Sequence, residues 1–413
     1  MSSLRLAKLR HAYYYWRVAK AANEMYRQGG ENSRRGLALF EAERANIQAG
    51  QAWVSKNASH GMAEAEMCSF YADACPYLLD LRQHSRVWMK WLEDAIAGAR
   101  RIGRKDMLAS HTGNLGIAYA NLGDTAQAIR YFRKHLALSR QNGKRKGEQS
   151  AISNLGLMYR NKGEMRRAIR FFEKSLALAA ELRDKAAEGN ALGNLGTVYA
   201  AIGEDERALD FHHRALDVAR ESGDLRWISI KLGDLGLLFA DVGQPERALP
   251  LFTEQLKIAR DLQDRRSEAA AIGNISRAYA ELGDYARLKE MSEHHISLAT
   301  EISDLRNEVV ALCNYGTAAA IFGEPEEAMR AFDRATGLAR QTGDASFEGK
   351  AIFNKAVALA HIGRLSAAIT LAEEAMTIFT RIEDRRSQSK VREKLALWRE
   401  ALKELIVYGQ LRS

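Results

Sequence analysis

Apolar residues recur at helical spacing along most of this chain, in pairs of runs separated by a glycine. Within residues 104–141 the two runs consist of Leu108, Leu115, Tyr119 and Leu122, and then of Ala128, Phe132, Leu136 and Leu138. A spacing of three to four residues places these side chains on one face of a helix and leaves the other face polar. The pattern therefore predicts pairs of amphipathic helices, here called helix A and helix B.

The pairs repeat every 40 residues. The segments GNLG, SNLG, GNLG and GDLG begin at residues 113, 153, 193 and 233, and seven units begin at residues 104, 144, 184, 224, 264, 304 and 344. A unit of this size buries its apolar face only against its neighbours, so the units must stack. The predicted fold class is all-α, a solenoid of antiparallel helix pairs.

Glycine and aspartate mark the predicted helix ends. A glycine after each helix A can adopt the left-handed conformation that closes a last turn; these glycines are Gly123, Gly163, Gly203, Gly243, Gly283, Gly323 and Gly363. An aspartate before a helix can accept a backbone N–H of its first turn; these aspartates are Asp184, Asp224, Asp264, Asp304, Asp344 and Asp384. Pro245 and Pro325 fit the first turn of helix B, where the missing N–H has no partner.

Small residues recur where the two helices of a pair should cross. Gly116 and Ala128 have counterparts in most units, and they let helix axes approach to about 8–10 Å. The phenylalanines at Phe132 and its counterparts are predicted to fill the space between successive pairs. The pattern breaks in the fifth unit, which has Ser276 and Leu288, and in the seventh, where Ala356 replaces the glycine. We expect looser or shifted packing at these breaks.

Together these columns resemble the tetratricopeptide repeat in a 40-residue form. The resemblance implies a right-handed superhelical solenoid in which helix A lines the concave side. It covers residues 104–383. Residues 61–103 then read as a degenerate helix pair that caps the array, residues 1–60 as N-terminal helices, and residues 384–413 as a C-terminal capping helix.

The N-terminal segment carries a second resemblance. It is similar to the linker helices of bacterial signal-transducing ATPases through Arg10, His11, Ala12, Tyr13, Tyr14, Tyr15, Glu43, Asn46, Ala49, Ala52 and Trp53. In those proteins the repeat array resembles a sensor that holds the ATPase inactive. No phosphate-binding loop accompanies it here, because Gly143–Lys144 and Gly349–Lys350 lack the preceding glycine and the following Ser or Thr.

Charge is distributed unevenly over the array. Residues 82–183 hold 21 Lys and Arg against 8 Asp and Glu, whereas residues 184–223 hold 4 against 8. The basic section could steer an acidic partner, and it could equally be a solvated outer face.

No catalytic motif, metal-spaced cysteine set or dinucleotide fingerprint occurs in the sequence. Cys68, Cys75 and Cys313 form no CxxC pair and are predicted to be core residues. The adjacent histidines at 212–213 and 294–295 point about 100° apart on a helix and make poor ligand sets. We predict a protein with no enzymatic activity, metal or cofactor, and a cytoplasmic location without membrane spans.

One polar column is not explained by packing alone. It consists of Asn114, Asn154, Asn194, Asp234, Asn274, Asn314 and Asn354. Asparagine is a mediocre helix former, so each costs several tenths of a kcal/mol relative to alanine. Hydrogen bonds to a neighbouring repeat could offset that cost by fixing the register of the stack. Alternatively, because successive A helices lie about 10 Å apart and an extended peptide advances about 3.3 Å per residue, each asparagine could hold the backbone of every third peptide residue.

Neighbouring positions would give a groove its selectivity. In the second and third units these are Ser150, Leu157, Arg160, Asn161, Asn190 and Thr197. Because Arg160 lies in the basic section, we expect an acidic partner segment. The favoured function is a protein-interaction scaffold that binds a peptide segment of a protein partner in the concave groove.

Two alternatives remain open at this stage. The first is a sensor module that controls a signalling ATPase or another effector. The second is nucleic-acid binding through residues 82–183, which we disfavour because the section lacks regularly interleaved aromatic residues for base stacking. The sequence makes no prediction of oligomeric state.

Overall fold

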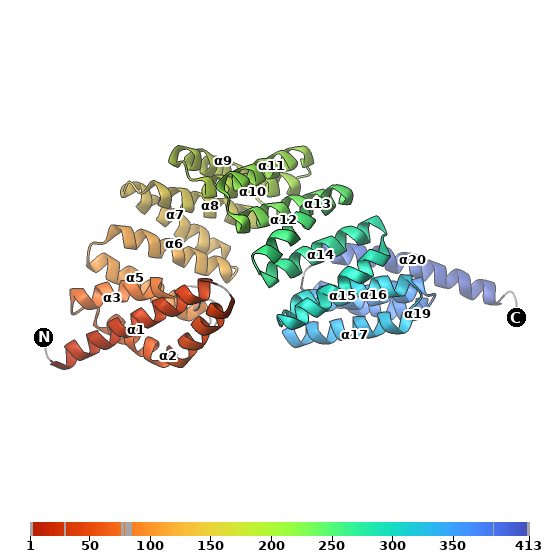
Figure 1. The fold of residues 1–413 in the computed structure, drawn as a ribbon, viewed down its shortest axis with the longest axis horizontal. Helices are drawn as coiled ribbons and strands as arrows, with labels where there is room; N and C mark the ends of the chain where they lie inside the picture. Colours follow the sequence, from red (N-terminus) through yellow and green to blue (C-terminus); the bar gives the residue numbers. More distant parts are fainter. Residues whose placement is uncertain (1–2, 29, 76–77, 79–84, 383, 411–413) are drawn as a thin grey trace. The chain divides into compact units, whose positions relative to one another are not determined.

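The computed structural model of the protein describes all residues except 1–2, 29, 76–77, 79–84, 383 and 411–413 (Figure 1). The described chain is helical and divides into two compact units, Met1–Val218 and Ala219–Ser413. Helices of the first unit are α1 (Ser3–Gln28), α2 (Gly30–Asn57), α3 (Met62–Ala74), α5 (Ser85–Arg101), α6 (Lys105–Asn121), α7 (Thr125–Gln141), α8 (Arg145–Asn161), α9 (Met165–Leu182), α10 (Lys185–Ala201) and α11 (Asp205–Ser222), which runs past the division.

The second unit continues the alternation of A and B helices. Its helices are α12 (Leu225–Asp241), α13 (Pro245–Asp261), α14 (Arg265–Leu282), α15 (Tyr285–Glu301), α16 (Leu305–Ile321), α17 (Pro325–Thr342), α18 (Ala345–His361), α19 (Leu365–Arg381) and α20 (Arg385–Gln410). Successive described helices pack against each other from α1 to α10 and from α12 to α20, as expected for a solenoid of antiparallel pairs. Within the described residues, no helix has the length and apolar content required to cross a membrane.

The predicted helix ends are confirmed. All seven glycines that follow the A helices adopt positive φ angles, between 71° and 82°. Asp184, Asp224, Asp264, Asp304 and Asp344 each accept a backbone N–H from the first turn of the next helix, and Asp384 accepts from the backbone N–H of Ser387 at 3.0 Å. Pro245 and Pro325 lie in the first turn of α13 and α17. These local signals fix where each helix ends and where the next begins, once in every 40 residues.

Two glycines of the second unit give a matched test of this conformational requirement. Gly323 has a φ angle of 75°, whereas Gly337 lies within α17 with ordinary helical φ and open space around its Cα. We expect Gly323→Ala to destabilise the unit by about 1–2 kcal/mol because a Cβ is strained in the left-handed region. Gly337→Ala should instead stabilise it by up to about 1 kcal/mol. Thermal unfolding followed by circular dichroism compares them, and a loss of stability in both variants would contradict the assignment.

The small-residue column and the phenylalanine column pack directly on each other. A Cβ added to Gly116, Gly156 or Gly236 would lie 2.5–2.7 Å from the ring of Phe132, Phe172 or Phe252, each in the B helix of the same pair. The rings therefore fill the space within a pair, so the prediction that they lie between successive pairs was wrong. The glycine is required because a ring occupies the position where its Cβ would be.

Substituted residues at the breaks in this pattern remain buried. In the fifth unit Ser276 replaces the glycine, Leu288 replaces the alanine and Ser292 replaces the phenylalanine, and all three are fully buried. Volume lost at one position is regained at the others. In the seventh unit Ala356 faces a B helix that carries Ala372 instead of a phenylalanine, and both are fully buried. The residues at both breaks thus remain shielded from solvent.

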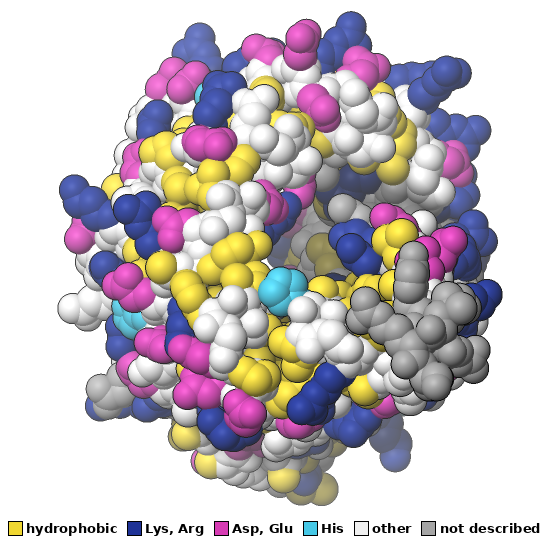
Figure 2. Space-filling model, turned by 90° about the vertical axis from the view of Figure 1, so that its right-hand side faces the viewer, with side chains coloured by type: hydrophobic (Ala, Val, Ile, Leu, Met, Phe, Trp, Pro, Cys, Tyr) yellow, Lys and Arg dark blue, Asp and Glu magenta, His cyan; other side chains and the backbone are white. Residues whose placement is uncertain are grey.

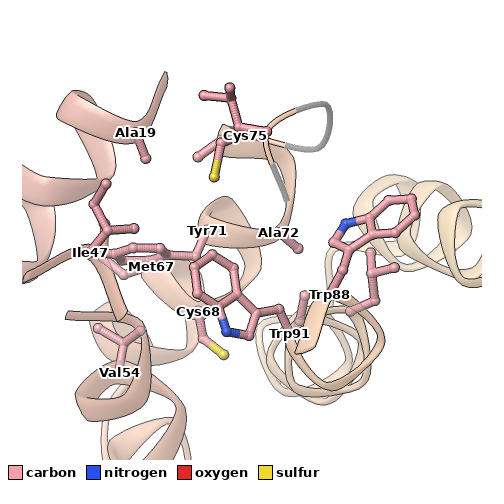
Figure 3. Close-up of a cluster of buried hydrophobic side chains, with 14 of the residues drawn as sticks. Ala19, Ile47, Val54, Met67, Cys68, Tyr71, Ala72, Cys75, Trp88 and Trp91 are labelled. Carbon is pink, nitrogen blue, oxygen red and sulfur yellow. The ribbon is translucent and has the colours of Figure 1, made fainter. Parts of the chain in front are cut away.

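Helices α1, α2, α3 and α5 share a core rich in aromatic residues (Figure 3). Tyr71 is fully buried, donates a hydrogen bond to the backbone carbonyl of Ala12 at 2.7 Å, and meets the Trp91 ring edge-on at 5.8 Å between centroids. Cys68 and Cys75 lie in this core and Cys313 lies in the second unit. Burial raises the pKa of Cys68 and Cys313 to about 12, so these thiols are core residues without nucleophilic character.

Candidate peptide-binding face

In each unit the A helices form the inner layer. Within the first unit α8 contacts both α6 and α10, and within the second α12, α14, α16 and α18 contact one another in succession. No comparable contact joins successive B helices among the described residues. Because one layer is drawn together and the other is spread apart, each stack curves toward its A helices. We call the exposed side of α6, α8 and α10 the inner face of the first unit.

Every member of the asparagine column is half-buried. Each member comes directly before a buried or half-buried residue of helix A, and none is fully buried or fully exposed. The members are Asn114, Asn154, Asn194, Asp234, Asn274, Asn314 and Asn354. This location at the edge of the inner face leaves part of each amide or carboxylate accessible. It also allows some of them to reach the preceding repeat.

Hydrogen bonds divide the column into two groups. Asn114 donates to Asp73 Oδ1 at 3.5 Å, Asn274 donates to Gln255 Oε1 at 3.4 Å, and Asn354 hydrogen-bonds the thiol of Cys313. These bonds reach a preceding helix and fit the role of fixing register. Asn154, Asn194 and Asn314 have no side-chain hydrogen bond within the described part of the chain.

Asp234 departs from the column in its surroundings as well as its identity. Its carboxylate accepts a hydrogen bond from Lys231 at 2.9 Å, and Lys231 is buried at a position where most other A helices carry alanine. The aspartate is thus paired inside its own helix. Nearby Arg277 is held by Asp241 at 2.6 Å and by Glu281 at 2.8 Å. Most of these polar side chains on the A helices of the second unit therefore have a hydrogen-bond or ion-pair partner.

The first unit differs because its inner face carries a cation without a partner. Arg160 is half-buried and forms no ion pair or hydrogen bond with any described residue. Burial lowers its pKa from the ordinary value. The equivalent positions on the other six A helices are alanines, so helix packing does not require a long side chain here.

Helical geometry places Arg160 and the asparagines on different edges of the inner face. Six residues separate Arg160 from Asn154, which turns it about 120° around α8. The asparagine edge points toward the preceding repeat, as the bond from Asn114 to Asp73 of α3 indicates. Arg160 therefore lies on the opposite edge of the inner face, about 9 Å further along α8 than Asn154.

The remaining predicted groove residues surround these two edges. Ser150, Asn161, Asn190 and Thr197 are exposed, and Leu157 is half-buried. The Thr197 hydroxyl donates to the backbone carbonyl of Gly193 at 2.9 Å. The inner face of the first unit is thus rich in amides and hydroxyls, with Ile117 as an exposed apolar side chain on α6.

The structure also brings together a cluster that sequence analysis missed. Ser69 Oγ lies 2.8 Å from His111 Nε2, and His111 Nδ1 lies 3.4 Å from Asp73 Oδ1. This is the composition of a Ser-His-Asp triad, but Ser69 and His111 are both 0% exposed. A substrate could not reach the hydroxyl of Ser69. The contacts of the cluster instead join α3 to α6 and hold Asp73 beside Asn114. His111 is 42 residues from Ser69 and 38 from Asp73 in the sequence, so no local motif predicts the cluster.

Other polar clusters hold the stack together. Glu148 is buried and accepts hydrogen bonds from Arg140 and Arg145, each at 2.8 Å, and Arg145 also reaches Glu181 at 2.5 Å. The bond from Arg140 lowers the pKa of Glu148. Among the described residues no group of three His, Cys, Asp or Glu side chains is arranged to hold a metal ion. His212 and His295 are buried while His213 and His294 are exposed, as the helical spacing predicts.

These features define a tetratricopeptide-like helical solenoid. Tetratricopeptide-repeat family models match residues 148–221, and residues 111–146 and 232–266, so the chain carries tetratricopeptide repeats. A model described as anaphase-promoting complex subunit 5 matches residues 284–348. No curated protein gives a significant match to the sequence.

Three solved structures share this fold at low sequence identity. The apo quorum sensor NprR from B. thuringiensis is 14% identical, with 83% of this chain and 96% of that chain covered and a TM-score of 0.59. A STAND protein with a tetratricopeptide repeat sensor from Pyrococcus horikoshii is 14% identical, with 83% and 55% covered and a TM-score of 0.54. Aspartyl phosphate phosphatase F from Bacillus subtilis is 12% identical, with 76% and 92% covered and a TM-score of 0.52.

Proposed function

We propose that this protein is a non-enzymatic interaction module whose first unit binds an extended acidic peptide segment of a protein partner on its inner face. The observation that carries the proposal is the set of three half-buried side chains without hydrogen-bond partners, Asn154, Asn194 and Arg160, on adjacent helices. A half-buried polar group without a protein partner keeps donors and acceptors that a ligand can engage, and each such hydrogen bond contributes about 1 kcal/mol. Nothing in the helix packing requires any of the three.

The spacing of the helices suits an extended chain. Two intervals between α6, α8 and α10 amount to about 20 Å, which a peptide of about six residues spans. The amides of Asn154 and Asn194 can each pair with a backbone N–H and C=O of such a peptide. Arg160 lies about 9 Å further along α8 than Asn154, so it is suited to a peptide carboxylate that extends from the backbone toward the C-terminal end of α8.

Binding to arrayed synthetic peptides of seven residues, with and without a central Asp or Glu, tests this proposal. We expect the wild-type protein to prefer the acidic peptides, and Asn154→Ala combined with Asn194→Ala to weaken binding at least about tenfold, because each lost amide forfeits hydrogen bonds worth about 1 kcal/mol. Arg160→Ala should remove the preference for acidic peptides. Gln141→Ala, which removes an exposed amide from the end of α7, is the control. Unchanged affinity in the asparagine variants would overturn the proposal.

A sensor role is a second candidate. Two of the structures that share the fold are described as a quorum sensor and as a protein with a repeat sensor. The same inner face would then receive a signalling peptide, and binding would alter the activity of an effector. Mixing the protein with a candidate effector and measuring that activity with and without the peptide separates the two roles.

A further inference from the structure

Basic side chains gather on the outer helices α7 and α9 of the first unit. Helix α7 contains no Asp or Glu in its 17 residues, and it exposes Arg130, Arg133 and Lys134. Helix α9 exposes Arg166, Arg170 and Lys174, and also Arg167, which pairs with Glu164 at 2.6 Å. Its two glutamates are Glu173, which is exposed, and Glu181, which is bound by Arg145.

The usual arrangement in this protein is different. On the face drawn in Figure 2, basic and acidic side chains alternate over the surface. At the positions equivalent to Arg170 and Lys174, the next outer helix, α11, follows this rule, since Arg214 pairs with Asp210 at 3.4 Å. Its Arg207 pairs with Glu204 at 2.9 Å, as Arg167 of α9 pairs with Glu164. The excess positive charge is therefore a property of α7 and α9 and not of outer helices in general.

Four of these cations form two equivalent pairs. Arg130 and Lys134 on α7 are related to Arg170 and Lys174 on α9 by one 40-residue repeat, and α7 and α9 both pack against α8. Within each pair the side chains are one helical turn apart, about 6 Å. None of the four has an acidic partner among the described residues; Arg130 contacts Gln127 at 3.4 Å and Lys134 lies 5.0 Å from the centroid of the Tyr131 ring.

We propose that the outer face of α7 and α9 binds an acidic helical segment of a partner protein. A helix with Glu or Asp at i and i+4 presents two carboxylates at the same 6 Å spacing as each basic pair. Arginine binds carboxylates through parallel hydrogen bonds, and exposed cations of one sign speed encounter with an acidic partner. This surface is distinct from the inner face and does not depend on the proposed peptide site.

The aromatic residues under the patch argue against single-stranded nucleic acid. Tyr131 stacks on Tyr119 and Phe171 stacks on Tyr159, each pair with centroids 5.2 Å apart. Since these rings already face other rings, none is left free as a platform for bases. Four cations on a convex surface also neutralise few phosphates of a duplex, which gives weak binding at physiological salt.

Fluorescence anisotropy with a labelled 21-residue alanine-based helical peptide that carries glutamates at i and i+4 tests the proposal, with a glutamine version of the peptide as the uncharged probe. We expect binding of the glutamate peptide that weakens as salt rises from 50 to 200 mM, and no binding of the glutamine peptide. Changing Arg130, Lys134, Arg170 and Lys174 to Gln together should weaken binding about tenfold to a hundredfold.

Matched controls separate this surface from other sites. Changing Arg207 and Arg214 of α11 to Gln removes exposed arginines that already have partners, and it should leave affinity unchanged, as should Asn154→Ala. Circular dichroism establishes that each variant is folded. Equal binding of the two peptides, or full affinity in the fourfold variant, overturns the proposal. Tighter binding of a 20-base-pair DNA duplex than of the glutamate peptide overturns it in favour of nucleic acid.

Discussion

Replacing Phe172 with alanine is expected to destabilise the first unit by about 3–5 kcal/mol, the range for a buried phenylalanine. Phe172 is completely buried, and its ring lies against the backbone of Gly156, where an added Cβ would come within 2.5 Å. Alanine would leave a cavity between α8 and α9 that neither helix can fill by itself. Urea unfolding followed by circular dichroism measures the loss. The adjacent Phe171, which is half-buried and stacks on Tyr159, gives a control with a smaller expected cost.

The fifth unit shows how this loss can be compensated. There the equivalent positions are Ser276, Leu288 and Ser292, which together fill the same space in a different way. We expect the triple variant Gly156→Ser, Ala168→Leu and Phe172→Ser to be more stable than Phe172→Ser alone, because volume-conserving changes in a core cost less than a cavity does. A triple variant less stable than the single one would show that the three positions do not act as a set.

Acidification from pH 6.5 to pH 4 is expected to lower the stability of the second unit by up to about 3 kcal/mol through His295. Burial lowers the pKa of this histidine to about 4, outweighing Asn307 and Asp304, which act in the opposite direction. In the unfolded chain its pKa is near 6.5, so between these values the unfolded state binds a proton that the folded state does not. Stability is therefore fully present above pH 6.5, declines as the pH falls, and has lost the whole contribution of this group near pH 4.

His295→Gln provides the matched variant. Gln255 occupies the equivalent position one unit earlier and packs against Gly233 as His295 packs against Gly273. The variant should keep the fold and lose most of the pH dependence between pH 7 and pH 5, where carboxylates contribute little. Chemical unfolding at several pH values compares it with the wild-type protein. An identical slope in both proteins would show that His295 does not cause the pH dependence.

Much of the fold follows from local signals in the sequence. Gly123 and its counterparts end helix A because only glycine adopts positive φ without strain, and Asp184 and its counterparts begin the next helix by accepting backbone N–H groups. These requirements involve residues a few positions apart. A regular period of such signals is therefore enough to predict the helix pairs and their stacking.

The sequence predicted the candidate site only in part. Sequence alone identified the asparagine column, but it could not tell which members reach a neighbouring helix, as Asn274 does, and which remain without a partner, as Asn154 and Asn194 do. It gave no indication of the buried contact between Ser69 and His111.

The sequence by itself determined the all-α class, the 40-residue period and the ends of the helices, because capping and chain reversal depend on neighbouring residues. Only the tertiary structure decided which polar side chains have hydrogen-bond partners and that Phe172 packs on the glycine of its own pair. It also decided that Ser276, Leu288 and Ser292 together fill the space that glycine, alanine and phenylalanine fill in other units. These outcomes depend on contacts between helices, where a side chain's environment is set by residues about 20 to 40 positions away.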